Sequence, residues 1–263
     1  MRPMPSKSET LLLLACACLV AVALFGPAVI QPPGYHGFAD QRVLWGVPFA
    51  MDVLSNLPFA LAGVAGLWFL GKAPPRALSN VQRAMAILFF GGLVLTACGS
   101  AWYHAQPDDA GLAIDRIGMA AAFAGLLGLA AAGRVSERAG ALLGLTILLL
   151  APVAIELGSS TGNVLPWAAL QFGGMAVVVW LAWLRPRPGA LVIRLGWVIL
   201  AYAAAKLLEI NDRAVFDLTG QLVSGHTLKH LVAALAALPV LAAVLALRKG
   251  GQNATGIAWR SPV

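Results

Sequence analysis

The sequence has little charge. Only 11% of its 263 residues are Asp, Glu, Lys or Arg, whereas 60% are hydrophobic, and the mean hydropathy is +0.82. Soluble domains carry about 25% charged residues. So few charges cannot cover the apolar surface of this chain, which excludes an ordinary soluble domain and predicts an integral membrane protein. In a soluble protein the net charge of +7 would suggest binding to nucleic acid. In a membrane protein, the side of the membrane on which the charges lie is more informative than their sum.

Cysteine is also scarce. The chain has three cysteines, Cys16, Cys18 and Cys98, and each lies in an apolar run. We therefore expect buried packing residues rather than disulfides or metal ligands. No internal repeat is visible, and the segments between the apolar runs are too short for a second domain.

Long apolar runs are what the sequence has in quantity. A helix needs about 20 apolar residues to cross the hydrocarbon core. We predict an all-α integral membrane fold with eight spans, at about 10–30, 51–71, 84–104, 112–133, 139–157, 164–184, 191–210 and 226–247. The seventh carries Arg194 and Lys206 near its two ends, where both side chains can snorkel to the interfaces.

The first span resembles a secretory signal in its basic start and apolar run. The run continues through Ile30 without a convincing cleavage site, so we expect a retained helix. The predicted organisation is an N-terminal transmembrane helix over 1–30, a membrane domain over 31–248 and a tail over 249–263.

Lysine and arginine are unevenly distributed between the two sides of this topology. Thirteen of the 18 fall on the side of the N-terminus, whereas nine of the 11 acidic residues fall on the opposite side. Because positive residues mark cytoplasmic loops, we predict that both termini are cytoplasmic and that the acidic side faces outward.

All four histidines belong to the outward side. They are His36, in a loop, and His104, His226 and His230, at the ends of predicted spans. Ser100 and Asp115 lie at the same end, within the stretch GSAWYHAQPDDAGLAIDRIGM at 99–119. Ionisable residues within membrane spans are costly and mark functional sites, so this end is the candidate site.

The histidine spacing predicts a metal site. His226 and His230, in SGHTLKHL, are four residues apart on one helix face and can hold one zinc ion. His104 would complete three protein ligands and leave a fourth position for water, as in catalytic zinc sites. Asp115 would accept a proton from that water, and Ser100 would donate a hydrogen bond to the oxyanion of an attacked carbonyl.

Simpler interpretations exist for each residue. The histidines could be hydrogen-bonded packing residues, Asp115 an interfacial partner of Arg116, and Ser100 a helix-packing hydroxyl. Haem ligation fits less well, because a serine and an aspartate would have no role in it. We favour the metal site because three of the four histidines join in it.

Other polar residues near this end have two interpretations. Asp52, Ser55 and Asn56, at the start of the second span, would either brace the metal ligands or cap that helix. For Lys206 and Glu209 we expect a local ion pair. Lys229 lies about 100° around the helix from its histidine neighbours, and we expect it to snorkel to the interface.

The pattern resembles the CREST superfamily of membrane hydrolases, and within it the bacterial branch of the alkaline ceramidase family. The match consists of Ser-x3-His, an Asp after ten further residues and a late HxxxH. It is carried by FADQRVLWGVPFAMDVLSNLPFALAG at 38–63, GSAWYH and IDRIGM within 99–119, YAAAKLLEINDRAVF at 202–216 and SGHTLKHL at 224–231.

The resemblance implies a seven-helix ceramidase-like bundle plus the extra N-terminal helix. It implies Zn²⁺ bound by His104, His226 and His230, with Ser100 and Asp115 as catalytic residues. The implied reaction is hydrolysis of the N-acyl amide of a ceramide-like membrane lipid to a sphingoid base and a fatty acid. The implied location is a bacterial inner membrane, with the site on the periplasmic side and no nucleic-acid partner.

Two departures from the family pattern stand out. Ile117 and Gly118 replace Leu-Pro after the Asp-Arg pair, which should loosen the start of the fourth span. The acidic calcium-binding segment of animal and yeast ceramidases is represented only by Asp40 and Asp52, so we predict no calcium. The alternatives are a receptor-like or regulatory CREST-type protein with a structural zinc site, a hydrolase of another acyl lipid and, less favoured, a transporter.

Overall fold

The computed structural model describes residues 4–256, and the side chains of residues 4–247. Over that range the chain is helical and forms no β-strand, only two isolated β-bridges, which confirms the expected all-α class. The predicted tail, 249–263, falls partly inside the last helix, which extends to Gly256; the rest of it lies outside the described residues.

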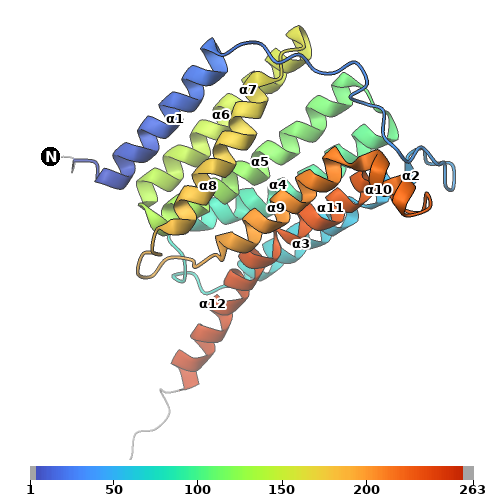
Figure 1. Cartoon of the computed structure of the whole chain (residues 1–263). Helices are drawn as coiled ribbons and strands as arrows, with labels where there is room; N and C mark the ends of the chain where they lie inside the picture. The colour runs from blue at the N-terminus through green and yellow to red at the C-terminus, as the bar shows by residue number, and fades with distance from the viewer. Residues whose placement is uncertain (1–3, 257–263) are drawn as a thin grey trace, which may run out of the picture.

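Figure 1 shows the helices as one bundle. In chain order the elements are α1 (Lys7–Phe25), α2 (Ala50–Leu54), α3 (Leu57–Gly71), α4 (Asn80–Ala105), α5 (Asp109–Arg134), α6 (Glu137–Thr161), α7 (Leu165–Ala168), the π-helix η1 (Ala169–Gly173), α8 (Gly174–Trp183), α9 (Leu195–Ile210), α10 (Asp212–Leu218), α11 (Gly225–Leu235) and α12 (Leu238–Gly256).

Among the described residues, seven helical stretches are long and apolar enough to cross a membrane. They are Lys7–Phe25, Ala50–Gly71, Asn80–Ala105, Asp109–Arg134, Glu137–Thr161, Leu165–Trp183 and Gly225–Leu247. Each overlaps one of the eight expected spans. The chain is therefore an integral membrane protein by the length and composition of its helices.

The remaining expected span, 191–210, is shorter than predicted. Its helix, α9, has 16 residues, about 24 Å at the rise of an α-helix, and begins only after Arg194. The preceding residues 191–194 are not helical, and they alternate between buried side chains, Leu191 3% and Ile193 1% exposed, and exposed ones. Gln82 accepts a hydrogen bond from the Leu191 N–H, and Arg134 donates one to the Ile193 carbonyl, so two side chains replace helical hydrogen bonds there.

Helix α1 lies at the edge of the bundle, against α7 and η1 (Figure 1). Most of its surface faces away from the protein. The expectation that the cysteines are buried is therefore wrong for Cys18, on α1, and for Cys98, on α4, which are both exposed, while Cys16 is partly buried. All three are free thiols.

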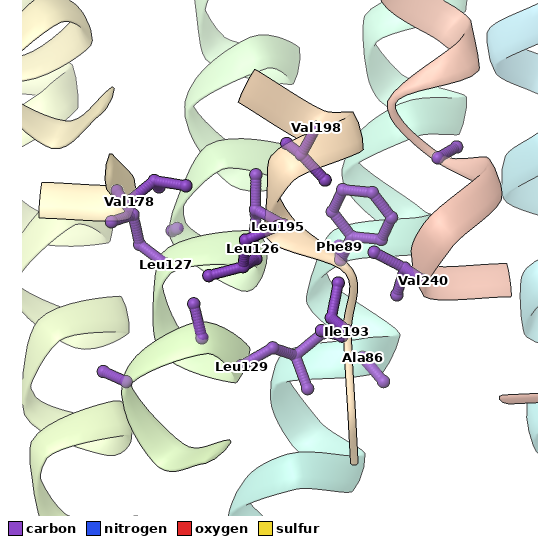
Figure 2. Close-up of a cluster of buried hydrophobic side chains, with 14 of the residues drawn as sticks. Ala86, Phe89, Leu126, Leu127, Leu129, Val178, Ile193, Leu195, Val198 and Val240 are labelled. Atoms are coloured by element: carbon purple, nitrogen blue, oxygen red, sulfur yellow. The ribbon is translucent and has the colours of Figure 1, made fainter. Parts of the chain in front are cut away.

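The interior is filled by aliphatic and aromatic side chains from α4, α5, α8, α9 and α12. Figure 2 shows part of this core, in which Phe89, Leu126 and Val198 come together from three helices. Such packing carries much of the association between membrane helices, because lipid tails are as apolar as the side chains.

Glycines let α4 and α5 approach closely. A Cβ on Gly118 of α5 would stand 2.5 Å from the backbone nitrogen of Thr96, and one on Gly99 of α4 would stand 2.8 Å from the Ile114 carbonyl oxygen. Helix α5 runs unbroken through Gly118. This contact sets the candidate residues of α4 opposite Asp115 on α5.

Candidate metal centre

Three buried histidines converge from two helices. His104 lies in the last turn of α4, whereas His226 and His230 lie in the first two turns of α11. Their ligand atoms all fall within 4.8 Å of one another, and the Nε2 atoms of His104 and His226 are 3.3 Å apart. With Zn–N bonds of 2.0–2.1 Å, two nitrogens of a tetrahedral site stand about 3.3 Å apart. The cluster could therefore hold a metal ion.

A network of hydrogen bonds fixes the start of α11. The Ser224 hydroxyl caps the helix by accepting from the Thr227 N–H. The buried Asp52 carboxylate of α2 accepts from the Thr227 hydroxyl at 2.6 Å. Asp212 accepts from the His226 N–H at 2.8 Å. Two carboxylates from other helices thus hold the turn that carries His226.

Ser55 determines which nitrogen of His230 is available. Its hydroxyl donates to the Asp52 carbonyl at 2.9 Å, so towards His230 Nδ1, 2.8 Å away, it acts as an acceptor. The His230 ring then carries its proton on Nδ1 and presents the Nε2 lone pair to the cluster. This is the arrangement that holds metal-ligating histidines.

The bracing interpretation is thus confirmed for Ser55, whose hydroxyl contacts His230. The Asp52 carboxylate supports the histidines only through Thr227 and Ser224. Neither the N-cap of α2 nor that of α3 has a side-chain hydrogen bond, so the alternative that these residues cap the start of a helix is wrong. Asn56 donates to the Asp52 carbonyl at 2.9 Å. The chain changes from α2 to α3 at these residues, which is why Ser55 reaches α11.

A loop covers the histidines. The Phe38 ring packs edge-on against His104 and His226, with centroids 4.6 Å and 4.5 Å away. Sequence reasoning did not single out Phe38, because an aromatic residue in a loop shows no periodicity. Two residues on, Asp40 is buried and accepts from the Arg42 Nε at 2.8 Å. Burial raises the pKa of Asp40, but the guanidinium outweighs this and brings it below its ordinary value.

Ser100 and Asp115 are brought together beside the histidines. Both are buried, and the Ser100 hydroxyl faces the Asp115 carboxylate across the contact between α4 and α5. The Oδ1 atom of Asp115 has no hydrogen-bond partner. Buried polar atoms are normally satisfied, so an unpaired carboxylate oxygen at this position is suited to a water or a substrate group.

Lys229 does not snorkel, so that expectation is wrong. Its ammonium donates to Glu209 Oε1 at 2.8 Å and to His226 Nε2 at 3.1 Å. Glu209 also pairs with Lys206, which confirms the expected local ion pair. The sequence could not predict the Lys229 contact because Glu209 belongs to another helix, α9, which packs on α11.

Two cavities meet at this centre. An apolar cavity, lined by Phe59, Phe89, Leu93, Leu126 and Met175 among others, reaches Ser100 and His230. A more polar cavity contains His226, Glu209, Arg116 and Tyr35. Asp115, Met119, Trp167, Gln171 and Lys229 line both. The arrangement joins an apolar compartment to a polar one at Asp115 and Lys229.

The fourth histidine lies outside the cluster. His36 Nδ1 is 2.9 Å from the Tyr103 hydroxyl, and its Nε2 is 3.2 Å from Asp109. It therefore fastens the loop after α1 to the ends of α4 and α5. Asp108 caps α5 by accepting from the Gly111 N–H.

Comparison with known proteins finds no matching family model and no matching curated protein.

Proposed function

We propose that this chain is a zinc-dependent membrane amidase that hydrolyses the N-acyl amide of ceramide-like lipids. The observation that supports it best is the convergence of His104, His226 and His230 where a polar and an apolar cavity meet. Beside these histidines, the Oδ1 atom of Asp115 is buried without a hydrogen-bond partner. A receptor-like protein with a structural zinc site would have less need for such an unpaired carboxylate. A hydrolase of another acyl lipid would use the same residues.

The donor set fits zinc. Three neutral imidazoles are a common set of protein ligands for catalytic zinc, and the bond from Ser55 to His230 supplies the outer support that such ligands need. When bound, zinc supplies a Lewis acid that makes water reactive at neutral pH. No calcium is proposed.

Asp115 and Ser100 would perform the proton and charge steps. Asp115 holds the proton that leaves the attacking water and returns it to the amine of the cleaved amide. Ser100 donates a hydrogen bond to the carbonyl oxygen as negative charge develops on it.

The two cavities would divide the substrate. The acyl chain lies in the apolar cavity between Phe59, Phe89 and Leu126, and the polar end of the lipid lies in the cavity of Tyr35, Arg116 and Glu209. The amide then falls at the junction, beside Asp115 and Lys229. This division suits a lipid whose scissile bond lies just below its headgroup.

The proposal includes the topology. The seven-helix ceramidase-like core consists of the six candidate spans after α1 together with α9, which would cross as the seventh span in chain order, with the non-helical residues 191–194 extending it. Both termini are cytoplasmic and the histidines face the periplasm of a bacterial inner membrane.

A direct assay tests the reaction. Purified protein is incubated in detergent with a ceramide, and released fatty acid is measured before and after removal of metal with a chelator. We expect release that stops on chelation and returns when Zn²⁺ is added. If a panel of N-acyl and O-acyl lipids gives no release from zinc-loaded protein, the amidase proposal is wrong and the receptor-like alternative gains support.

A further inference from the structure

Arg116 is a buried cation that the proposed chemistry does not use. It lies in α5, seven residues after Asp109, about 10 Å along the helix. It is 5% exposed and lines the polar cavity with His226. A buried charge is costly unless it is paired, so its surroundings indicate what it is there to bind.

The guanidinium has aromatic neighbours but no anionic partner. Its carbon lies 5.7 Å from the ring centroid of Tyr35 and 5.6 Å from that of Trp167. Among the described residues, no carboxylate oxygen is within 4.0 Å of it and no acceptor takes its hydrogen bonds. Contact with aromatic faces holds the guanidinium while leaving its N–H groups available.

The other cations of the cavity are paired, and so is the Asp212 carboxylate. Lys206 and Lys229 both pair with Glu209. The two oxygens of Asp212 accept from the N–H groups of Ala39 and His226. Asp115 is next to Arg116 in sequence but forms no ion pair with it. Of the three cations lining this cavity in the described part of the chain, Arg116 alone lacks a carboxylate partner.

Gln171 provides a second uncommitted group. It is 9% exposed and lines both cavities, and its side-chain amide makes no hydrogen bond to any described residue. It lies in the π-helix η1, and such single-turn insertions within α-helices occur often at functional sites. A buried amide and a buried guanidinium therefore face one cavity without protein partners.

We propose that Arg116 and Gln171 form a headgroup subsite for a lipid that carries an oxyanion, such as a phosphate monoester. The planar guanidinium can donate two parallel hydrogen bonds to such a group, and Gln171 can add a third. This inference rests on the proposed function, because it takes the bound lipid to be the substrate of the amidase. Among the N-acyl lipids that the protein hydrolyses, it makes those with an anionic headgroup the preferred substrates.

A structural role for Arg116 is the competing explanation. A Cβ on Gly158, near the carboxyl end of α6, would stand 3.5 Å from the Arg116 Nη1 atom. The partial negative charge of that helix end offsets part of the buried charge. If this were its whole role, the protein would not distinguish an anionic headgroup from a neutral one.

The test measures equilibrium binding of two fluorescent N-acyl lipids that differ only in headgroup, a phosphate or a hydroxyl, in neutral detergent micelles. We expect the wild-type chain to bind the phosphate lipid roughly 10-fold to 100-fold more tightly, as a charge-assisted bond to Arg116 would give. Arg116→Lys keeps the positive charge but loses the planar pair of N–H donors, so it should lose most of this preference. Gln171→Glu, of equal size, should lose it through repulsion.

The matched control is Arg213→Lys. Arg213 also contacts an aromatic ring, that of Phe216, but is exposed and does not line the cavity. It should keep the full preference. Equal affinity of the wild-type chain for both lipids would overturn the inference, as would an unchanged preference in Arg116→Lys and Gln171→Glu.

Two further arms separate the possible outcomes. Millimolar inorganic phosphate should displace the phosphate lipid only weakly; strong displacement without any preference between the lipids would indicate a site for free anions and contradict a headgroup subsite. Hydrolysis is scored separately on the same samples. A headgroup preference without hydrolysis would therefore count against the amidase and not against binding by Arg116.

Discussion

At the scale of single residues, the centre depends on side chains that hold other side chains. Ser55 fixes the His230 ring, Asp52 fixes Thr227, and Asp212 fixes the backbone of His226. Without these contacts the two imidazoles of α11 would be free to turn away from His104. The positions of the nitrogens are thus set by residues that would never touch the metal.

Ser55→Ala tests this support. It removes the acceptor for Nδ1 of His230, so the ring loses both its preferred tautomer and its orientation. We expect zinc affinity to fall by roughly 10-fold to 100-fold, the usual effect of losing an outer hydrogen bond to a zinc ligand. Competition with a fluorescent chelator measures it. Unchanged affinity would mean that Ser55 does not orient His230.

Ser100→Ala tests the role in charge stabilisation. We expect zinc content to stay at the wild-type level and kcat to fall by roughly 10²–10³, the effect of losing one oxyanion donor. Ser160→Ala is the control, because Ser160 is exposed and bonds only to the Glu156 carbonyl of its own helix. A Ser100→Ala enzyme with full kcat would leave Ser100 as a packing residue.

The sequence could predict the histidine cluster but not all of the residues that surround it. His226 and His230 share a helix face by spacing alone, and His104 was assigned by its place at the same end. The contacts of Lys229 and Phe38 could not be predicted. Lys229 is positioned by Glu209 of another helix, and Phe38 lies in a loop that shows no periodicity. Arg116 was visible in the sequence, but its lack of an anionic partner was not.

At the scale of elements, the contact between α4 and α5 aligns the two halves of the centre. Gly118 lies at this contact, where the ceramidase pattern that the sequence resembles has proline. Although that departure suggested a loosened helix start, α5 is continuous there and packs directly on the backbone of α4. The residue that appeared to weaken the helix is the one that permits the close approach.

Gly118→Ala tests this packing. The new Cβ would stand 2.5 Å from the Thr96 nitrogen, so α4 and α5 must separate. We expect a loss of about 1–3 kcal/mol of stability, seen as a lower Tm in detergent. Gly91→Ala on α4 is the matched control, since a Cβ there meets no atom within 4 Å. Equal melting of the two variants would contradict the account of this contact.

Apolar run length predicted most of the membrane helices but overestimated α9. A mostly apolar run indicates that a segment can be buried, not that it is helical. Residues 191–194 stay outside the helix because Gln82 and Arg134, more than 50 positions away, bond to the Leu191 N–H and the Ile193 carbonyl. Such long-range compensation leaves no periodic pattern in the segment itself.

At the scale of the whole molecule, the proposal assigns the acidic end to the outside. Asp109, at the start of α5, and Arg138, in the first turn of α6, are exposed at opposite ends of the bundle. With Cys16, Cys18 and Cys98 replaced by alanine, Asp109→Cys should react with a membrane-impermeant maleimide in intact bacterial cells whose outer membrane has been made permeable. Arg138→Cys should react only after lysis. The reverse pattern would invert the topology.

The central claim is a zinc ion held by His104, His226 and His230, and the metal content of the purified protein tests it most directly. We predict one zinc per wild-type chain by elemental analysis, and none in His226→Ala, whereas His36→Ala, which removes the histidine outside the cluster, keeps the full amount. Full zinc occupancy in His226→Ala, or a wild-type chain that takes up no zinc when it is supplied, would contradict the account.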